Sequence, residues 1–159
     1  YLKQQANIGE TVTMDIARQV LDSVRIMHRM CYSHLDIKPE NILVSSDQIS
    51  GIVDFDNGYF GDLLHDVTTT ICWFCFKDNK LDLRFVESFV SSYQKERELS
   101  EIEKQYLGQS IKFRLLRESI IWPMYVSHNI PIAKKFSDYF LTLYNNYNIS
   151  ETELRRRVN

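Results

Sequence analysis

Apolar residues recur at helical spacing near the start of the chain. Six of them follow one another at intervals of four and three: Val12, Ile16, Val20, Val24, Met27 and Cys31. This spacing places them along one face of an amphipathic helix. Threonine commonly precedes a first helical turn, so we expect the helix to begin near Thr11 or Thr13.

The pattern changes to that of a β-hairpin after residue 40. Residues 41–44 (NILV) and 51–55 (GIVDF) are short apolar runs rich in β-branched residues, and residues 45–48 (SSDQ) have the composition of a turn. A hairpin of these segments places Asn41 at the start of one strand and Asp54 at the end of its partner. Two side-chain oxygens then face one site.

Further helices are expected downstream. Residues 81–97 carry apolar side chains on one face, and residues 100–103 (SEIE) form a capping box that starts a new helix. The apolar stripe of that helix runs to Pro123, where we expect it to end. Pro131 suits the first turn of the next helix, which should end near residues 145–148. The expected fold class is mainly α with a small β-hairpin.

Composition excludes several classes of protein. The 159 residues suffice for one core, and a net charge of −2 gives no basis for nucleic-acid binding. No apolar stretch is long enough to span a membrane, and no secretory signal pattern is present. Three cysteines give no disulfide framework, which favours a cytoplasmic location. The chain carries no sign of its oligomeric state.

Several residues that invite a functional reading are better explained by structure alone. Cys72 and Cys75 are spaced like a redox or zinc pair, but their apolar helical setting favours buried thiols. His28 and His128 are expected to be buried or solvated and not catalytic. Residues 155–157 (RRR) are expected to form a solvated tail.

The clearest chemistry lies in two runs, HLDIKPEN at residues 34–41 and IVDFD at residues 52–56. Asp36 and Asn41 share a loop, and Asp54 follows at the end of an apolar run. Phosphoryl transfer needs a carboxylate near the attacking hydroxyl and further oxygen ligands that hold Mg²⁺ against the nucleotide phosphates. The two runs contain such a set in a plausible order.

These runs resemble the kinase catalytic loop H-R-D-x-x-x-x-N and the later D-F-G motif. The activation segment and A-P-E motif of protein kinases are missing. Instead, a short acidic segment spans residues 54–67 and contains Asp66 near its end. The layout of this segment resembles that of the aminoglycoside phosphotransferase superfamily. That superfamily includes aminoglycoside, choline and homoserine kinases. The resemblance of this chain to it implies a protein-kinase-like fold.

Stretches further along the chain resemble the homoserine kinases of this superfamily. They are residues 66–76, 89–94, 99–103 and 111–119. The loop also departs from the pattern, because Leu35 stands where the family usually has Gly and Lys38 where it often has His. Residues 56–57 (DN) replace an aromatic pair that is common in homoserine kinases.

The resemblance implies roles for individual residues. Asp36 would orient or deprotonate the acceptor hydroxyl, and Lys38 would offset charge on the transferred phosphoryl group. Asn41 and Asp54 would ligate Mg²⁺ beside ATP. His34 would support the metal aspartate, and Asp66 would brace the catalytic loop.

The acceptor implied by the resemblance is a small hydroxylated amine, with a homoserine-like amino alcohol favoured over choline or an aminoglycoside. Asp56 and Asp62 are either supporting partners of the metal site or part of an amine-binding patch. Trp73 and Trp122 are either core residues or walls of the substrate groove. The competing class is a kinase-like interaction module without catalysis.

The nucleotide-binding half of a kinase has no counterpart in this sequence. The chain starts at Tyr1, and its five glycines form no Gly-rich loop. We therefore expect residues 1–159 to be the C-terminal lobe alone. Such a lobe should be inactive without the N-terminal lobe that grips ATP.

Overall fold

The computed structural model describes residues 10–46, 48–125 and 130–159, and these are mainly helical, as the sequence predicted. In chain order the elements are α2 (Glu10–Arg29), β1 (Tyr32–Ser33), the 3₁₀ turn η1 (Pro39–Asn41), β2 (Ile42–Ser45), β3 (Gln48–Ile52), β4 (Tyr59–Phe60), α3 (Leu64–Phe74), β5 (Phe76–Lys77), β6 (Lys80–Leu81), α4 (Leu83–Gln94), α5 (Glu101–Tyr125), α6 (Ile130–Asn146) and α7 (Glu151–Val158). The strands form antiparallel pairs, β1 with β4, β2 with β3 and β5 with β6.

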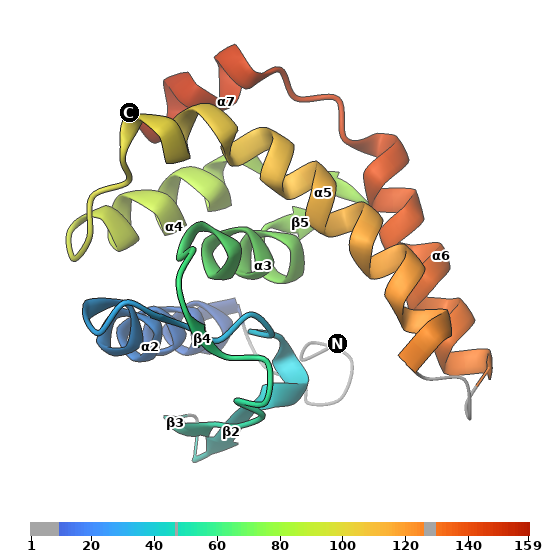
Figure 1. Ribbon diagram of the computed structural model, residues 1–159, viewed down its shortest axis with the longest axis horizontal. Coiled ribbons are helices and arrows are strands. Elements are labelled where there is room, and N and C mark those ends of the chain that lie inside the picture. Colours follow the sequence, from blue (N-terminus) through green and yellow to red (C-terminus); the bar gives the residue numbers. More distant parts are fainter. Residues whose placement is uncertain (1–9, 47, 126–129) are drawn as a thin grey trace.

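Helix α3 occupies the centre of the molecule. Figure 1 shows α2 and the β2–β3 hairpin on one side of it and α4, α5 and α7 on the other. Nearly every residue of α3 from Leu64 to Cys72 is buried, including three consecutive threonines at 68–70. Their hydroxyls donate to the carbonyls of His65 and Asp66, at 2.7–2.9 Å. These internal bonds let a polar run lie in a core without unpaired hydroxyls.

Helices α5 and α6 lie side by side along one flank of the molecule (Figure 1). The apolar stripe predicted for α5 is buried at Ile111 and Leu115, and Phe140 and Leu143 of α6 are fully buried as well. The capping box at the start of α5 is confirmed. The amide of Glu103 donates to Ser100 Oγ at 3.2 Å, and the Ser100 amide donates back to the Glu103 carboxylate at 2.8 Å.

The prediction that Pro123 ends this helix was wrong. Helix α5 continues through Pro123 to Tyr125. Proline lacks the amide that would bond the carbonyl four residues earlier, here that of Ser119. The hydroxyl of Ser137 on α6 donates to this carbonyl at 2.6 Å. A tertiary contact thus satisfies the acceptor that the proline leaves unpaired.

The hairpin forms, with Ile42 opposite Ile52 and a bulge between Leu43 and Val44. Its second strand covers Gln48–Ile52 and not residues 51–55 as predicted. Asp54 has a φ of 71°, which is incompatible with a continuing strand. Aspartate is one of the residues that adopt this left-handed conformation most readily.

Helix α2 covers the expected region but ends before the last residue of its predicted stripe. Val20, Val24 and Met27 are buried. Cys31 lies beyond the helix end at Arg29, is exposed and has a φ of 55°. A left-handed residue is a common way to terminate a helix.

The C-terminal arginines form no solvated tail, in contrast to the prediction. They belong to α7, whose first turn is capped by Ser150 Oγ accepting from the Glu153 amide at 3.1 Å. Leu154 and Val158 of this helix are buried in the core. Arg155 and Arg157 pair with Glu101 and Glu87, at 2.6 and 3.1 Å. The S-x-x-E pattern at residues 150–153 was the overlooked helix signal.

Cys72 of α3 and Cys75, which directly follows that helix, are buried free thiols, as predicted. Burial raises the pKa of Cys75 to about 12 and raises that of Cys72 as well. Neither thiol is therefore ionised near neutral pH.

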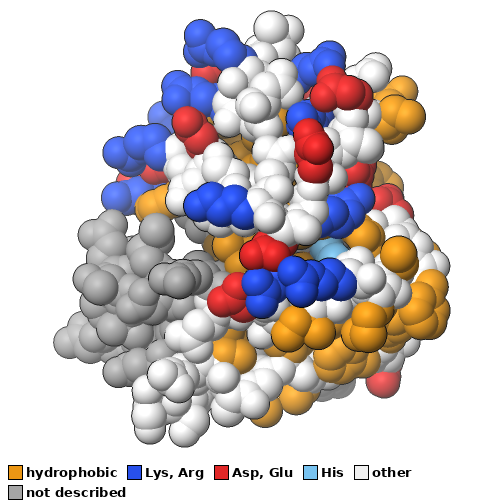
Figure 2. Space-filling view, turned by 90° about the vertical axis from the view of Figure 1, so that its left-hand side faces the viewer, with side chains coloured by type: hydrophobic (Ala, Val, Ile, Leu, Met, Phe, Trp, Pro, Cys, Tyr) orange, Lys and Arg blue, Asp and Glu red, His pale blue; other side chains and the backbone are white. Residues whose placement is uncertain are grey.

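Acidic and basic side chains intermingle over the upper part of the face shown in Figure 2, and hydrophobic side chains gather lower on that face. Surface ion pairs such as Arg25–Glu96 at 2.9 Å are typical of the molecule. In the part of the chain that the structure describes, every helix is too short or too polar to cross a bilayer.

Candidate active site

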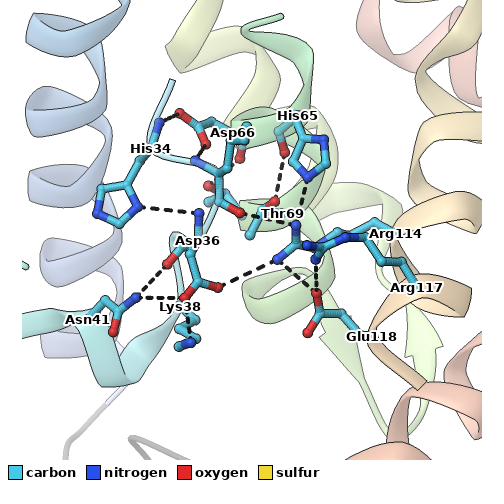
Figure 3. Close-up of polar contacts among 12 residues, drawn as sticks. His34, Asp36, Lys38, Asn41, His65, Asp66, Thr69, Arg114, Arg117 and Glu118 are labelled. Carbon is cyan, nitrogen blue, oxygen red and sulfur yellow. Dashed lines mark hydrogen bonds and ion pairs between the residues drawn. The ribbon is translucent and has the colours of Figure 1, made fainter. Parts of the chain in front are cut away.

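Asp66, near the start of α3, braces the loop that carries Asp36. Its side chain is fully buried and accepts hydrogen bonds from the amides of His34 and Leu35, each at 2.7 Å (Figure 3). Charge-assisted bonds of this kind are about twice as strong as neutral ones. Leu35 has a φ of 65°, so the loop turns sharply where Asp66 grips it.

A buried chain of polar groups orients Asp66 from behind. His28 Nε2 lies 3.0 Å from the Asp66 carboxylate, and His28 Nδ1 lies 2.7 Å from the Tyr93 hydroxyl. Arg97 donates to that hydroxyl oxygen at 3.1 Å. When the Tyr93 hydroxyl donates to Nδ1, it is Nε2 of His28 that donates to Asp66. Burial raises the pKa of Tyr93 to about 12, so it remains a proton donor at neutral pH.

His34 connects the loop to the end of the hairpin. Its ring is fully buried, with Nε2 3.1 Å from the carbonyl oxygen of Val53 and Nδ1 accepting from the Asp36 amide at 3.3 Å. Because Val53 directly precedes Asp54, the His34 ring fixes Asp36 relative to Asp54.

The Asp36 carboxylate is held mainly through Oδ2. This oxygen lies 2.5 Å from Lys38 Nζ and accepts from Asn41 Nδ2 at 3.1 Å. The same Asn41 nitrogen donates to the Asp36 carbonyl at 2.8 Å. Lys38 Nζ also lies 6.0 Å from the centre of the Trp122 ring. The loop residues singled out by sequence are thus in direct contact.

Asn41 and Asp54 lie on neighbouring ends of the hairpin. The Val53 amide donates to the Asn41 carbonyl at 2.9 Å, and the exposed Asp54 follows immediately. With its amide nitrogen bound to Asp36, Asn41 has its side-chain oxygen available to a cation. Within residues 10–46, 48–125 and 130–159, no cluster of three His, Cys, Asp or Glu side chains forms a metal site.

The residues that the sequence assigned to acceptor binding lie in different environments. Asp56 and Asp62 are exposed. Asp62 accepts from the Leu64 amide at 3.0 Å and lines a shallow groove together with Tyr106 and Phe113.

The two tryptophans also have different surroundings. Trp73 packs edge-on against Phe140 of α6, with ring centres 4.9 Å apart. Trp122 stacks on Phe136 at 4.2 Å and is the tryptophan that lies near Lys38.

Sequence reasoning missed Arg114, which reaches the same loop from α5. It is 1% exposed and donates to the Leu35 carbonyl at 3.1 Å (Figure 3). It lies 2.7 Å from His65 Nε2 and 2.9 Å from the Glu118 carboxylate. A charged pair spaced i, i+4 on the buried face of a helix was the available signal.

His65 is a neutral hydrogen-bond acceptor in this arrangement. Burial is the main cause that lowers its pKa to about 4, and the neighbouring Arg114 and Arg117 lower it further. The ring nitrogen facing Arg114 therefore carries no proton near neutral pH.

Comparisons with known proteins point to kinases. The family profile described as protein kinase domain matches residues 1–72. A homoserine kinase of Bradyrhizobium sp. strain BTAi1 is 33% identical over 90 residues, which are 53% of this chain and 28% of that protein. A homoserine kinase of Neisseria meningitidis serogroup B is 34% identical over 74 residues, 46% of this chain and 24% of the relative. A probable cell division protein kinase of Encephalitozoon cuniculi is 43% identical over 49 residues, 31% of this chain and 18% of that protein.

These matches support a phosphotransferase of the kinase-like superfamily, and the mainly helical fold is compatible with it. The chain spans about a quarter of the length of the homoserine kinases that it matches.

Proposed function

We propose that this chain is the C-terminal catalytic lobe of an ATP- and Mg²⁺-dependent kinase that phosphorylates a hydroxyl group on a small molecule. The observation that carries the proposal is the direct linkage of Asp36 to Asn41, and of Asn41 through Val53 to Asp54. Asp36, Asn41 and Asp54 are the residue types that phosphoryl transfer requires for the acceptor hydroxyl and the metal. Here they converge from a loop and a hairpin.

In this proposal, Asp36 accepts a hydrogen bond from the acceptor hydroxyl and takes its proton as the phosphoryl group is transferred. Lys38, half-buried beside Asp36, offsets negative charge that develops on the phosphoryl oxygens. In the structure, the Lys38 ammonium is paired with Asp36. When nucleotide binds, this ammonium would turn from Asp36 towards the phosphate.

Asn41 and Asp54 fit Mg²⁺ by their chemistry. Magnesium prefers oxygen ligands and keeps several waters, so protein sites often supply one or two ligands and the nucleotide phosphates supply others. An amide oxygen and an exposed carboxylate at adjacent hairpin ends make such a partial site. The metal supplies charge neutralisation on the phosphates when bound.

The favoured acceptor is a homoserine-like amino alcohol, in a cytoplasmic enzyme. Several of the matched relatives bear the name homoserine kinase, and their alignments extend over about half of this chain. Carboxylates such as Asp62 suit a substrate ammonium. Trp122 beside Lys38 suits the wall of an acceptor site and, for choline, a cation–π contact.

Another class of acceptor has its own support. The protein kinase profile over residues 1–72 and the Encephalitozoon match favour a protein substrate. The protein kinase profile covers residues 1–72 and the Encephalitozoon match covers 49 residues, whereas the Bradyrhizobium homoserine kinase aligns over 90 residues of this chain.

A substrate screen tests this function. ADP release by the full-length protein is measured with ATP, Mg²⁺ and, separately, homoserine, choline, an aminoglycoside and a generic protein substrate. We expect homoserine or another amino alcohol to give the highest kcat/KM. Phosphorylation of the protein substrate alone would overturn the assignment to small molecules. Absence of turnover with every substrate would favour a non-catalytic interaction module.

A further inference from the structure

The backbone of Leu35 is held at both of its polar groups. Asp66 accepts from its amide at 2.7 Å, and Arg114 donates to its carbonyl at 3.1 Å. The residue between these bonds has a φ of 65°, a left-handed conformation that is unfavourable for an L-residue other than glycine. Such a conformation persists only where its surroundings over-determine it. Asp66 of α3 and Arg114 of α5 together provide this restraint.

The two oxygens of Asp36, the next residue, have different surroundings. Oδ2 is bound by Lys38 and Asn41, at 2.5 and 3.1 Å. Among the described residues, Oδ1 accepts no hydrogen bond, and Arg114 Nη2 lies 3.8 Å from it. Oδ1 is therefore the oxygen that remains for an acceptor hydroxyl.

Arg114 is locked in place by its own partners (Figure 3). Nη1 reaches both the Leu35 carbonyl and the unprotonated nitrogen of His65, and Nη2 lies 2.9 Å from Glu118. Glu118 also pairs with Arg117 at 3.0 Å. A planar guanidinium can contact these partners at the same time, because its N–H groups point in several fixed directions. A lysine ammonium cannot reproduce this geometry.

We propose that Arg114 is a positioning residue of the active site, which clamps the Leu35 carbonyl and directs Asp36 Oδ1 towards the acceptor hydroxyl. The proposal rests on the proposed function in that Asp36 must be the residue that contacts the acceptor. Arg114 acts through Leu35 and Asp36 and does not itself touch the substrate.

Hydrogen exchange tests the clamp without any requirement for activity. We expect Arg114→Met to accelerate exchange of the Leu35 amide at least about tenfold while α3 and α5 remain protected. Arg117→Met is the matched control, since it removes the other cation beside Glu118 and contacts neither Leu35 nor Asp36. Equal protection of Leu35 in wild type and Arg114→Met would overturn the clamp. In an Arg114→Met protein that still folds, a uniform loss of protection across α3 and α5 would also overturn it, because that result indicates a general structural role.

A second variant covers the case in which Arg114→Met does not fold. The double change Arg114→Met with Glu118→Met removes both buried charges, and such replacements are often neutral or stabilising. The same local acceleration at Leu35 is expected, and its absence in a folded double variant counts against the clamp.

Kinetics of the full-length protein test the consequence for catalysis. A displacement of about 1 Å can cost about 100-fold in rate, so Arg114→Met should lower kcat about 100-fold. The KM for the acceptor should change less than about threefold, because the residue makes no substrate contact. An unchanged kcat would overturn the positioning role. If wild type shows no phosphotransfer while Arg114→Met still accelerates exchange at Leu35, the proposed function fails and the clamp stands.

Discussion

At the scale of single residues, the loop that carries Asp36 depends on a leucine in a conformation that favours glycine. Leu35 has a φ of 65°, and its amide and carbonyl are bound by Asp66 and Arg114. The side chain is partly exposed, so little packing compensates for the strain.

We therefore expect Leu35→Gly to be at least as stable as wild type, because relief of about 1–2 kcal/mol of strain offsets the entropy cost of glycine. Leu35→Val should lower the free energy of unfolding by about 1 kcal/mol or more, since a β-branched residue tolerates this conformation least. Urea unfolding of both variants measures the difference. A Leu35→Gly protein less stable than Leu35→Val would contradict the claim that the backbone of Leu35 is strained.

His65 gives the molecule a pH dependence whose direction follows from its surroundings. Burial, then Arg114 and Arg117, lower the pKa of His65 to about 4 from an ordinary value of 6.5. Between these values the unfolded chain binds a proton that the folded chain does not. The contribution of His65 to stability is thus complete above pH 6.5, is lost progressively as the pH falls to about 4, and changes no further below.

The variant His65→Gln should show a smaller loss of stability over the same range, because glutamine can accept from Arg114 and does not titrate. Urea unfolding of both proteins at pH 7.5, 5.5 and 4.5 gives the comparison, and other titrating groups cancel between them. Parallel profiles for wild type and variant would show that His65 is not the group responsible.

Much of the site could be predicted from sequence because its central residues are close along the chain. His34, Asp36, Lys38 and Asn41 occupy one loop, and their contacts follow from local spacing. Arg114 could not be placed in this way. Its bond to Leu35 joins residues 79 positions apart, and only the packing of α5 against α3 brings them together.

At the scale of elements, periodicity located most helices, and tertiary contacts decided where some of them end. Helix α5 passes through Pro123 because Ser137 of α6 supplies the missing donor to the Ser119 carbonyl. Helix α7 was mistaken for a tail because its arginines dominate the composition, although Leu154 and Val158 anchor it in the core.

The hydrogen bond from Ser137 on α6 to the Ser119 carbonyl on α5 predicts that substitutions of Ser137 and Pro123 are energetically coupled. Ser137→Ala should lower the free energy of unfolding by about 1–2 kcal/mol, since it leaves the Ser119 carbonyl unpaired. In a Pro123→Ala background the cost should be smaller by about 0.5–1 kcal/mol, because alanine restores the amide donor within the helix. Denaturant unfolding of the four proteins completes the double-mutant cycle. Strict additivity of the two changes would contradict this account of the passage through Pro123.

At the scale of the whole molecule, four helices converge on one loop. Asp66 from α3 and Arg114 from α5 hold it, His28 from α2 orients Asp66, and Tyr93 from α4 orients His28. The hairpin then brings Asp54 beside Asn41. This arrangement places candidate groups for an acceptor hydroxyl and for Mg²⁺ at one edge of the helical core, where the proposed nucleotide-binding lobe would complete the site.

The most direct test of the central claim is transfer of the γ-phosphate of ATP by the full-length protein and by its Asp36→Asn variant. Wild type should phosphorylate a small hydroxylated acceptor. Asp36→Asn should lose about 10²–10⁴-fold in kcat, since asparagine keeps the shape but cannot take the proton. Its thermal unfolding should match wild type closely enough to show an intact fold. A folded Asp36→Asn protein with unchanged turnover would contradict the claim that this loop is a catalytic site.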